Sequence, residues 1–195
     1  MTGMSSAPRL AAFFDFDATL VKHDSLPLFL SRCTGWPKTL FTFALAILTP
    51  DRSQPDLKGA IKASWLRHAL AGMPEAQARK AAEGLVPNWI PDIRQRMLDL
   101  KAEGAVIVVA TGALDLYVRA LLKDLPVDVI MATDMESENG VLTGRMKGGN
   151  CVRLEKARRV EEFLRSHGPF DRTYGFGNAP SDLPMLKLVD EARVI

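Results

Sequence analysis

Two aspartates and a threonine near the start of the chain have the spacing of catalytic or metal-binding groups. Asp15, Asp17 and Thr19 follow the apolar run Leu10–Phe14. A short apolar run with a polar break is typical of a buried parallel strand, and open α/β sheets bind ligands at the carboxyl ends of such strands. Because unpaired charge is costly to bury, two carboxylates there indicate a metal ion or catalysis. Alone, this spacing also fits the capped start of a loop.

Four more polar residues occupy similar positions later in the chain. Thr111 follows the second predicted strand, and Lys156 falls in the first turns of a predicted helix. Asn178 and Asp182 follow the fourth predicted strand. Singly, Thr111 and Asp182 could be helix N-caps, and Lys156 could be a surface lysine. In a doubly wound sheet, however, all of these positions converge on one crevice, so their joint occurrence predicts an active site.

The elements around these residues follow from hydrophobic periodicity and turn signals. Helices are predicted over Leu26–Cys33, Lys38–Leu48, Asp56–Ala71, Glu75–Leu85, Pro91–Glu103, Leu114–Lys123 and Arg153–His167. Strands are predicted over Leu10–Phe14, Ala105–Ala110, Val127–Met131, Arg172–Phe176 and Ala192–Ile195. Between 133 and 146, Asn139-Gly140 predicts a separate hairpin.

This alternation predicts an α/β fold, a doubly wound, Rossmann-like parallel sheet. Residues 1–20 and 105–195 form the predicted core domain, and 21–104 form a helical cap inserted after the first strand. The cap is placed to cover the carboxyl end of that strand. Because the chain stops on a predicted strand, we also expect a short C-terminal segment to be missing.

Length and composition describe a globular chain. It has 195 residues, 47% of them hydrophobic and 25% charged, which suffices for a buried core and excludes a disordered protein. The net charge of +2 gives no reason to expect a nucleic-acid partner. Cys33 and Cys151 lack metal-type spacing, and the N-terminus lacks the pattern of a secretory signal. We therefore expect a cytoplasmic protein, and composition leaves its oligomeric state open.

The longest apolar stretch runs from Thr39 to Leu48, between Pro37 and Pro50. A helix needs about 20 apolar residues to span a bilayer, so this stretch is too short to do so. We expect a buried helix here and rank contact with a membrane surface second.

In order along the chain, the polar residues match four motifs of a known superfamily. Asp15, Asp17 and Thr19 match its Asp-x-Asp-x-Thr motif. The Thr111 motif, the Lys156 motif and the loop ending at Asp182 match the others. The chain thus resembles the haloacid dehalogenase superfamily of phosphotransferases. Features similar to its phosphoserine phosphatase-like branch, subfamily IB, are the segments Asp24–Phe29, Leu142–Arg145, Asn150-Cys151 and Ser181–Leu186.

Two residues depart from the superfamily pattern. Ala18 stands where glycine is usual, and we expect no consequence because alanine is harmless at a negative φ. Asn178 stands where an aspartate commonly binds the metal ion. Its amide offers a carbonyl oxygen but no charge, so we expect weaker metal binding.

The resemblance implies a Mg²⁺-dependent phosphatase mechanism. Asp15 would attack phosphorus and form an aspartyl-phosphate, while Asp17 would protonate the leaving oxygen and then activate water. Thr111, backbone N–H groups at a helix start at Gly112, and Lys156 would bind the phosphoryl group. The implied Mg²⁺ ligands are Asp15, Asp17, Asn178 and Asp182.

The resemblance leaves the substrate open, and a small phosphorylated metabolite is the partner we rank first. A lipid phosphate at the membrane surface is the first alternative, because some relatives of this branch act on such substrates. A phosphate-binding regulatory module with weakened turnover is the second, motivated by Asn178. Five charged residues of the helical section are candidate substrate contacts, although we rank an ordinary surface charge first for each: Asp24, Arg32, Lys58, Lys62 and Arg67.

Overall fold

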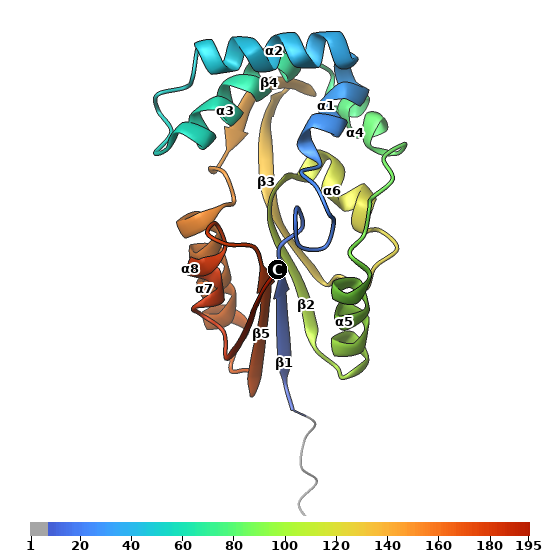
Figure 1. The fold of residues 1–195 in the computed structure, drawn as a ribbon, viewed down its shortest axis with the longest axis vertical. Coiled ribbons are helices and arrows are strands. Elements are labelled where there is room, and N and C mark those ends of the chain that lie inside the picture. Colours follow the sequence, from blue (N-terminus) through green and yellow to red (C-terminus); the bar gives the residue numbers. More distant parts are fainter. Residues whose placement is uncertain (1–7) are drawn as a thin grey trace, which may run out of the picture.

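In residues 8–195, which the computed structural model describes, six strands form one sheet in the order β4-β3-β2-β1-β5-β6. The strands are β1 (Leu10–Phe14), β2 (Val106–Leu114), β3 (Val129–Glu138), β4 (Val141–Lys147), β5 (Arg172–Gly177) and β6 (Glu191–Val194). Neighbouring strands run parallel, except that β3 and β4 are antiparallel. Helices cover both faces of the sheet (Figure 1), which confirms the predicted α/β, Rossmann-like fold.

The helices fall into two groups (Figure 1). Those between β1 and α5 in the chain lie beyond the carboxyl end of β1, and we call them the helical layer: α1 (Leu26–Thr34), α2 (Trp36–Leu48), α3 (Leu57–Leu70) and α4 (Glu75–Ala82). The others lie beside the sheet: α5 (Pro91–Ala102), α6 (Asp115–Leu122), α7 (Arg153–His167) and α8 (Leu183–Leu186). Every predicted helix is present, and α7 begins and ends at the predicted residues.

β1 lies in the middle of the sheet because all its residues are apolar and buried. Side chains alternate across a strand, so Phe13 and Phe14 pack on opposite faces. Phe13 meets Phe163 of α7 edge to face, with ring centroids 5.8 Å apart, whereas Phe14 stacks on Phe176 of β5 at 4.5 Å. This two-sided packing fixes the end of β1, where Asp15 begins the polar segment.

The third strand and the hairpin are one continuous structure, which corrects the prediction that kept them apart. β3 continues past its pairing with β2 and turns at Asn139-Gly140 into β4, which packs against α3. At Gly144 of β4 the φ is +79°, and a Cβ there would lie 2.7 Å from Arg67 Cα of α3. Glycine therefore allows the hairpin to lie directly under the helical layer.

The chain enters and leaves the helical layer through two hydrogen-bonded segments. Lys22 N donates to Asn88 O at 2.9 Å, and Ile90 N donates to Leu20 O at 2.8 Å. α5 follows the second segment and lies beside β2 (Figure 1). The two connections to the layer are therefore tied to each other at its base.

The division of the chain into a core of 1–20 with 105–195 and a cap of 21–104 stays a prediction. Residues 1–7 of that core lie outside the described residues. We propose that the helical layer is the part that moves as a cap, because α5 lies beside the sheet and contacts β2 instead of the layer (Figure 1).

The prediction of a buried helix over Thr39–Leu48 is wrong. α2 turns Thr39, Thr42 and Ala46 inward and leaves its large apolar side chains exposed. The inward hydroxyls bond to carbonyl oxygens of their own helix or its N-cap residue, so burying them leaves no unpaired polar group. No helix of residues 8–195 is long and apolar enough to cross a membrane.

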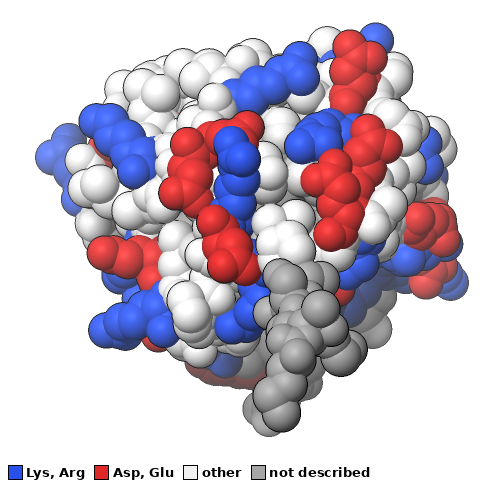
Figure 2. Space-filling model, turned by 90° about the horizontal axis from the view of Figure 1, so that it is seen from below, with Lys and Arg blue, Asp and Glu red and all other residues white. Residues whose placement is uncertain are grey.

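Surface charge is mixed on the face opposite the helical layer. Lys and Arg side chains lie between Asp and Glu side chains there (Figure 2). With the net charge of +2, this alternation gives no extended basic surface on that face for a polyanion.

Candidate active site

A buried lysine joins two aspartates at the carboxyl end of β1. Lys156, in the first turns of α7, donates from Nζ to Asp15 Oδ1 at 2.7 Å and to Asp182 Oδ1 at 2.5 Å. All three side chains are at least nine-tenths buried. Asp15 follows β1 and Asp182 precedes α8, so three predicted site residues from distant parts of the chain meet at one point.

Burial and charge act in opposite directions on these groups. Burial raises the pKa of Asp15 to about 6, although the Lys156 ammonium opposes the shift. Burial disfavours the charged form of Lys156, but Asp15 and Asp182 outweigh it and raise the pKa of the lysine. Lys156 therefore stays cationic and holds the nearest carboxylate oxygens in fixed positions.

Asp17 occupies a different environment from Asp15. Its Oδ1 accepts a hydrogen bond from Ser25 N, at the start of α1, at 2.9 Å. Burial, and to a smaller extent the charge of Asp24, raises the pKa of Asp17 to about 7. A carboxyl group with a pKa near neutrality can both donate and accept a proton at working pH.

Asn178 brings together two oxygen atoms. Its Nδ2 donates to Asp15 Oδ2 and to the Asp17 backbone carbonyl, each at 3.1 Å. Its Oδ1 accepts from the Ser181 hydroxyl at 2.8 Å. Asp182 Oδ2 accepts from the backbone N–H of Asn178 at 2.9 Å, so the loop after β5 is fixed at both ends.

The oxygen atoms of this loop and of the segment after β1 suit a hard cation. Asp15 Oδ2 and the Asp17 carbonyl already converge on one nitrogen atom, and Asn178 would add its oxygen by turning its amide. Within residues 8–195, no three His, Cys, Asp or Glu side chains are grouped to hold a metal. The oxygen donors therefore fit a Mg²⁺ ion that has fewer than three carboxylate ligands.

The expectation that Ala18 has no consequence is wrong, because its premise was a negative φ. Ala18 has a φ of +56°, in the left-handed region. Thr19, Leu20 and Val21 all donate their backbone N–H groups to Phe16 O across this turn, which holds Ala18 in that conformation. Alanine therefore carries a conformational cost that glycine would avoid.

Thr111 lies at the predicted place, but Gly112 does not begin a helix. β2 continues through both residues with an irregularity in its pairing to β3, and α6 begins only at Asp115. The Thr111 hydroxyl oxygen accepts from Ala113 N at 3.0 Å, which leaves its proton free to donate. A Cβ on Gly112 would lie 2.7 Å from Val152 Cγ1, so close packing requires glycine there.

Lys62 belongs to the site, although the sequence ranked it first as a surface charge and only second as a substrate contact. From α3 it reaches down to donate to Gly112 O at 2.6 Å and to Asn150 Oδ1 at 2.7 Å. Burial lowers the pKa of Lys62 to about 8, against the attraction of Asp24 and Asp17. The available signal was a lysine amid small and apolar residues of a predicted helix.

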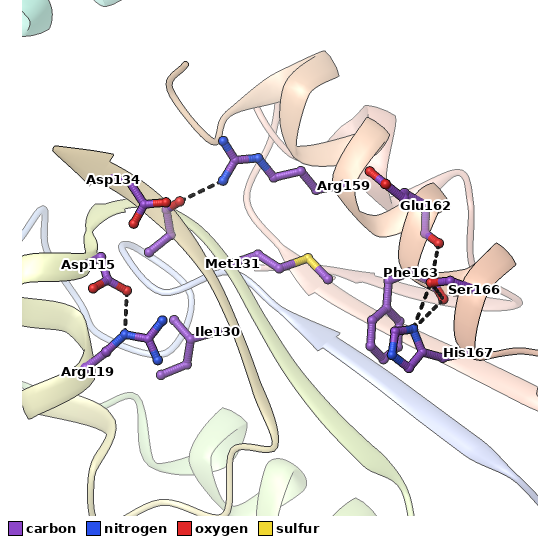
Figure 3. A pocket seen from close by; sticks show the side chains of 11 residues that line it. Asp115, Arg119, Ile130, Met131, Asp134, Arg159, Glu162, Phe163, Ser166 and His167 are labelled. Carbon is purple, nitrogen blue, oxygen red and sulfur yellow. Dashed lines mark hydrogen bonds and ion pairs between the residues drawn. The ribbon is translucent and has the colours of Figure 1, made fainter. Parts of the chain in front are cut away.

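A separate hollow of about 410 Å³ opens on the outer side of β3. It lies between α6 and α7, with Arg119 hydrogen-bonded to Asp115 on one side and His167 beside Ser166 on the other (Figure 3). None of the predicted site residues lines this hollow. The candidate site is therefore the buried cluster at the end of β1.

Comparison with known proteins identifies the family of the chain. The model of the haloacid dehalogenase-like hydrolase family matches residues 12–187. Protein CicA of Caulobacter vibrioides is 33% identical over 98% of this chain and 88% of its own length. Phosphoserine phosphatase SerB2 of Mycobacterium tuberculosis is 25% identical over 94% of this chain, which spans 43% of that protein.

Solved structures show the same fold. A Bordetella pertussis protein of unknown function superimposes with a TM-score of 0.76 at 22% identity, covering 96% of this chain and 90% of that one. A phosphoserine phosphatase solved as an analogue of its phospho-aspartyl intermediate superimposes with a TM-score of 0.68 at 19% identity, covering 97% and 87%.

Proposed function

The chain belongs to the haloacid dehalogenase-like hydrolases and is a phosphatase of their phosphoserine phosphatase-like branch; we propose that it hydrolyses a phosphomonoester of a small metabolite through an aspartyl-phosphate. The observation that carries the proposal is the Asp15–Lys156–Asp182 cluster at the carboxyl end of β1, with Asp17 beside it. No structural need accounts for so many buried ionisable groups in one place.

In the proposed first step, a carboxylate oxygen of Asp15 attacks phosphorus as the bond from phosphorus to the leaving oxygen breaks. Lys156 keeps Asp15 ionised and neutralises charge on the phosphoryl group. Asp17 gives its proton to the leaving oxygen, for which a pKa of about 7 is well suited. The Thr111 hydroxyl donates to a phosphoryl oxygen.

The second step reverses the role of Asp17. Its carboxylate accepts a proton from water, whose oxygen attacks phosphorus while the bond to Asp15 breaks. Inorganic phosphate leaves, and both aspartates return to their starting state. The hydrogen bond from Ser25 N holds Asp17 in place through both steps.

Mg²⁺ is the cofactor we propose, held by Asp15, the Asp17 carbonyl, the Asn178 amide oxygen and Asp182. When bound, it neutralises the negative charge of the phosphoryl group.

Substitution of the two aspartates tests the mechanism. We expect Asp15→Asn to abolish hydrolysis of a generic aryl phosphate, and Asp17→Asn to lower kcat about 10²–10⁴-fold. Asp124→Asn, at an exposed position after α6, is the matched control and should keep full activity. Normal turnover by the Asp15 variant would refute the assignment of the nucleophile.

Two alternatives remain open to direct tests. The exposed apolar side of α2 favours a lipid-phosphate substrate, which a comparison of phosphatidate-type and water-soluble esters would reveal. The neutral Asn178 favours a regulatory module with weakened turnover, and measurable release of phosphate from the aryl ester would exclude it.

A further inference from the structure

The outward side of α2 carries an unusual concentration of exposed apolar residues. Leu48 is 78% exposed, Phe41 68% and Leu40 61%, and Trp36 and Ile47 are also about half exposed. Isolated exposed apolar residues are ordinary on protein surfaces, but contiguous patches mark interaction sites.

These side chains form one continuous patch. At about 100° per residue, the exposed apolar positions of α2 fall within an arc of about 160°. We call this surface the α2 face: Trp36, Pro37, Leu40, Phe41, Phe43, Ala44, Ile47 and Leu48. The opposite side of the helix packs on α3, where Trp65 Nε1 donates to the Thr42 hydroxyl at 3.2 Å. α2 is the outermost helix of the layer (Figure 1), and within residues 8–195 the α2 face is exposed except at Phe43, whose ring packs against Trp65 with centroids 4.7 Å apart.

The fully exposed charged residues from α2 to the first turn of α3 are positive. The chain has no Asp or Glu from Ser25 to Pro50, while Lys38 on α2, Arg52 in the loop after it and Lys58 in the first turn of α3 are exposed. Within the described residues, none of these three forms an ion pair, whereas the acids that follow α2 do. Asp51 pairs with Arg67, and Asp56 with Arg153, so their negative charges are compensated locally.

We propose that the α2 face docks on the surface of an anionic lipid membrane. A helix with tryptophan, phenylalanine and leucine on one side, next to basic residues, is the type that lies in the interface between headgroups and acyl chains. Anionic headgroups would complement Lys38, Arg52 and Lys58.

The same charges disfavour a second copy of the chain as the occupant. In a two-fold contact each patch meets itself, which would bring the basic residues of both copies close together. The apolar area alone would fit a second copy of the chain or a membrane. Charge complementarity favours the anionic membrane. This proposal does not depend on the phosphatase mechanism.

Vesicle flotation with the full chain tests the proposal. We expect it to float with vesicles of phosphatidylcholine and phosphatidylglycerol, much less with phosphatidylcholine alone, and less as salt screens the charges. Phe41→Gln with Leu48→Gln should weaken binding to the anionic vesicles at least about tenfold, because both side chains would lose their apolar contact. Both residues are mainly exposed, so the fold should be retained.

Leu154→Gln is the matched control, because Leu154 is 76% exposed on α7, away from the α2 face. It should bind vesicles like the unchanged chain, and all variants should keep their aryl-phosphate hydrolysis. Failure of the unchanged chain to float would overturn the proposal. So would a lipid-free dimer that Phe41→Gln with Leu48→Gln converts to a monomer, because the α2 face would then join two copies.

Discussion

Replacing Ala18 by glycine should stabilise the protein, although alanine-to-glycine changes usually do the opposite. Ala18 has a φ of +56° in the turn between Asp17 and Thr19. An L-residue in that region costs roughly 1–2 kcal/mol, whereas glycine adopts it freely. Ala18 is exposed, so losing its methyl group removes little buried apolar surface.

The expected gain is smaller than the relieved strain. Glycine makes the unfolded chain more flexible, which costs about 0.4–1 kcal/mol. The difference leaves a rise of about 0.5–1 kcal/mol in the free energy of unfolding. In a chain of this size, that rise corresponds to about 1–4 °C in Tm. Urea unfolding should show a higher midpoint at an unchanged m-value.

A second exposed alanine provides the control. Ala44 lies in the middle of α2, in right-handed helical conformation, and is exposed. Ala44→Gly should lower the free energy of unfolding by about 1 kcal/mol. If Ala18→Gly also lowers it by that amount, the argument from the positive φ is refuted.

Three further predictions concern the site. Asn178→Asp should lower the Mg²⁺ concentration that gives half-maximal activity, because it adds an anionic oxygen ligand. Without metal it should lower Tm, because the new carboxylate would face Asp15. An unchanged midpoint of the Mg²⁺ titration would contradict this prediction. Burial lowers the pKa of Lys62 to about 8 in the folded chain, so the folded state loses the lysine proton before the unfolded state does. Between about pH 8 and pH 10.5, the free energy of unfolding of the unchanged chain should therefore rise relative to that of Lys62→Met, by at most about 3 kcal/mol. Fluoroberyllate with Mg²⁺ should increase amide-exchange protection at the paired segments 20–22 and 88–90; protection confined to Asp15 and its neighbours would indicate a static roof.

The sequence predicted the sheet well because its signals are local. β1 is an apolar run that ends in polar residues, and the position of Asp15 follows from where it ends. Thr111 lies where the apolar run of β2 ends, although the strand itself continues to Leu114. The bounds of α7 were also predictable, because Gly168-Pro169 ends the apolar periodicity. These features require no knowledge of what packs against them.

The orientation of α2 could not be predicted for a physical reason. Its apolar residues surround most of the helix, so periodicity does not define an inward side. The hydroxyl groups of Thr39 and Thr42 donate hydrogen bonds to backbone carbonyl oxygens, so these side chains can be buried at little cost in free energy. The burial of Lys62 was not predictable either, because its partners Gly112 and Asn150 lie far away in the sequence.

The role of Asn178 depends on the direction of its amide. Its Nδ2 lies where a cation would contact Asp15 Oδ2 and the Asp17 carbonyl, so the amide dipole already supplies partial positive charge between these oxygens. Binding a cation there requires the amide to turn and to give up the hydrogen bond from Ser181. The side chain of an aspartate at this position has no hydrogen-bond donor. Its carboxylate oxygen would therefore repel Asp15 Oδ2 and the Asp17 carbonyl oxygen. We therefore expect asparagine to stabilise the metal-free site and to weaken the binding of the proposed Mg²⁺ through the same amide group.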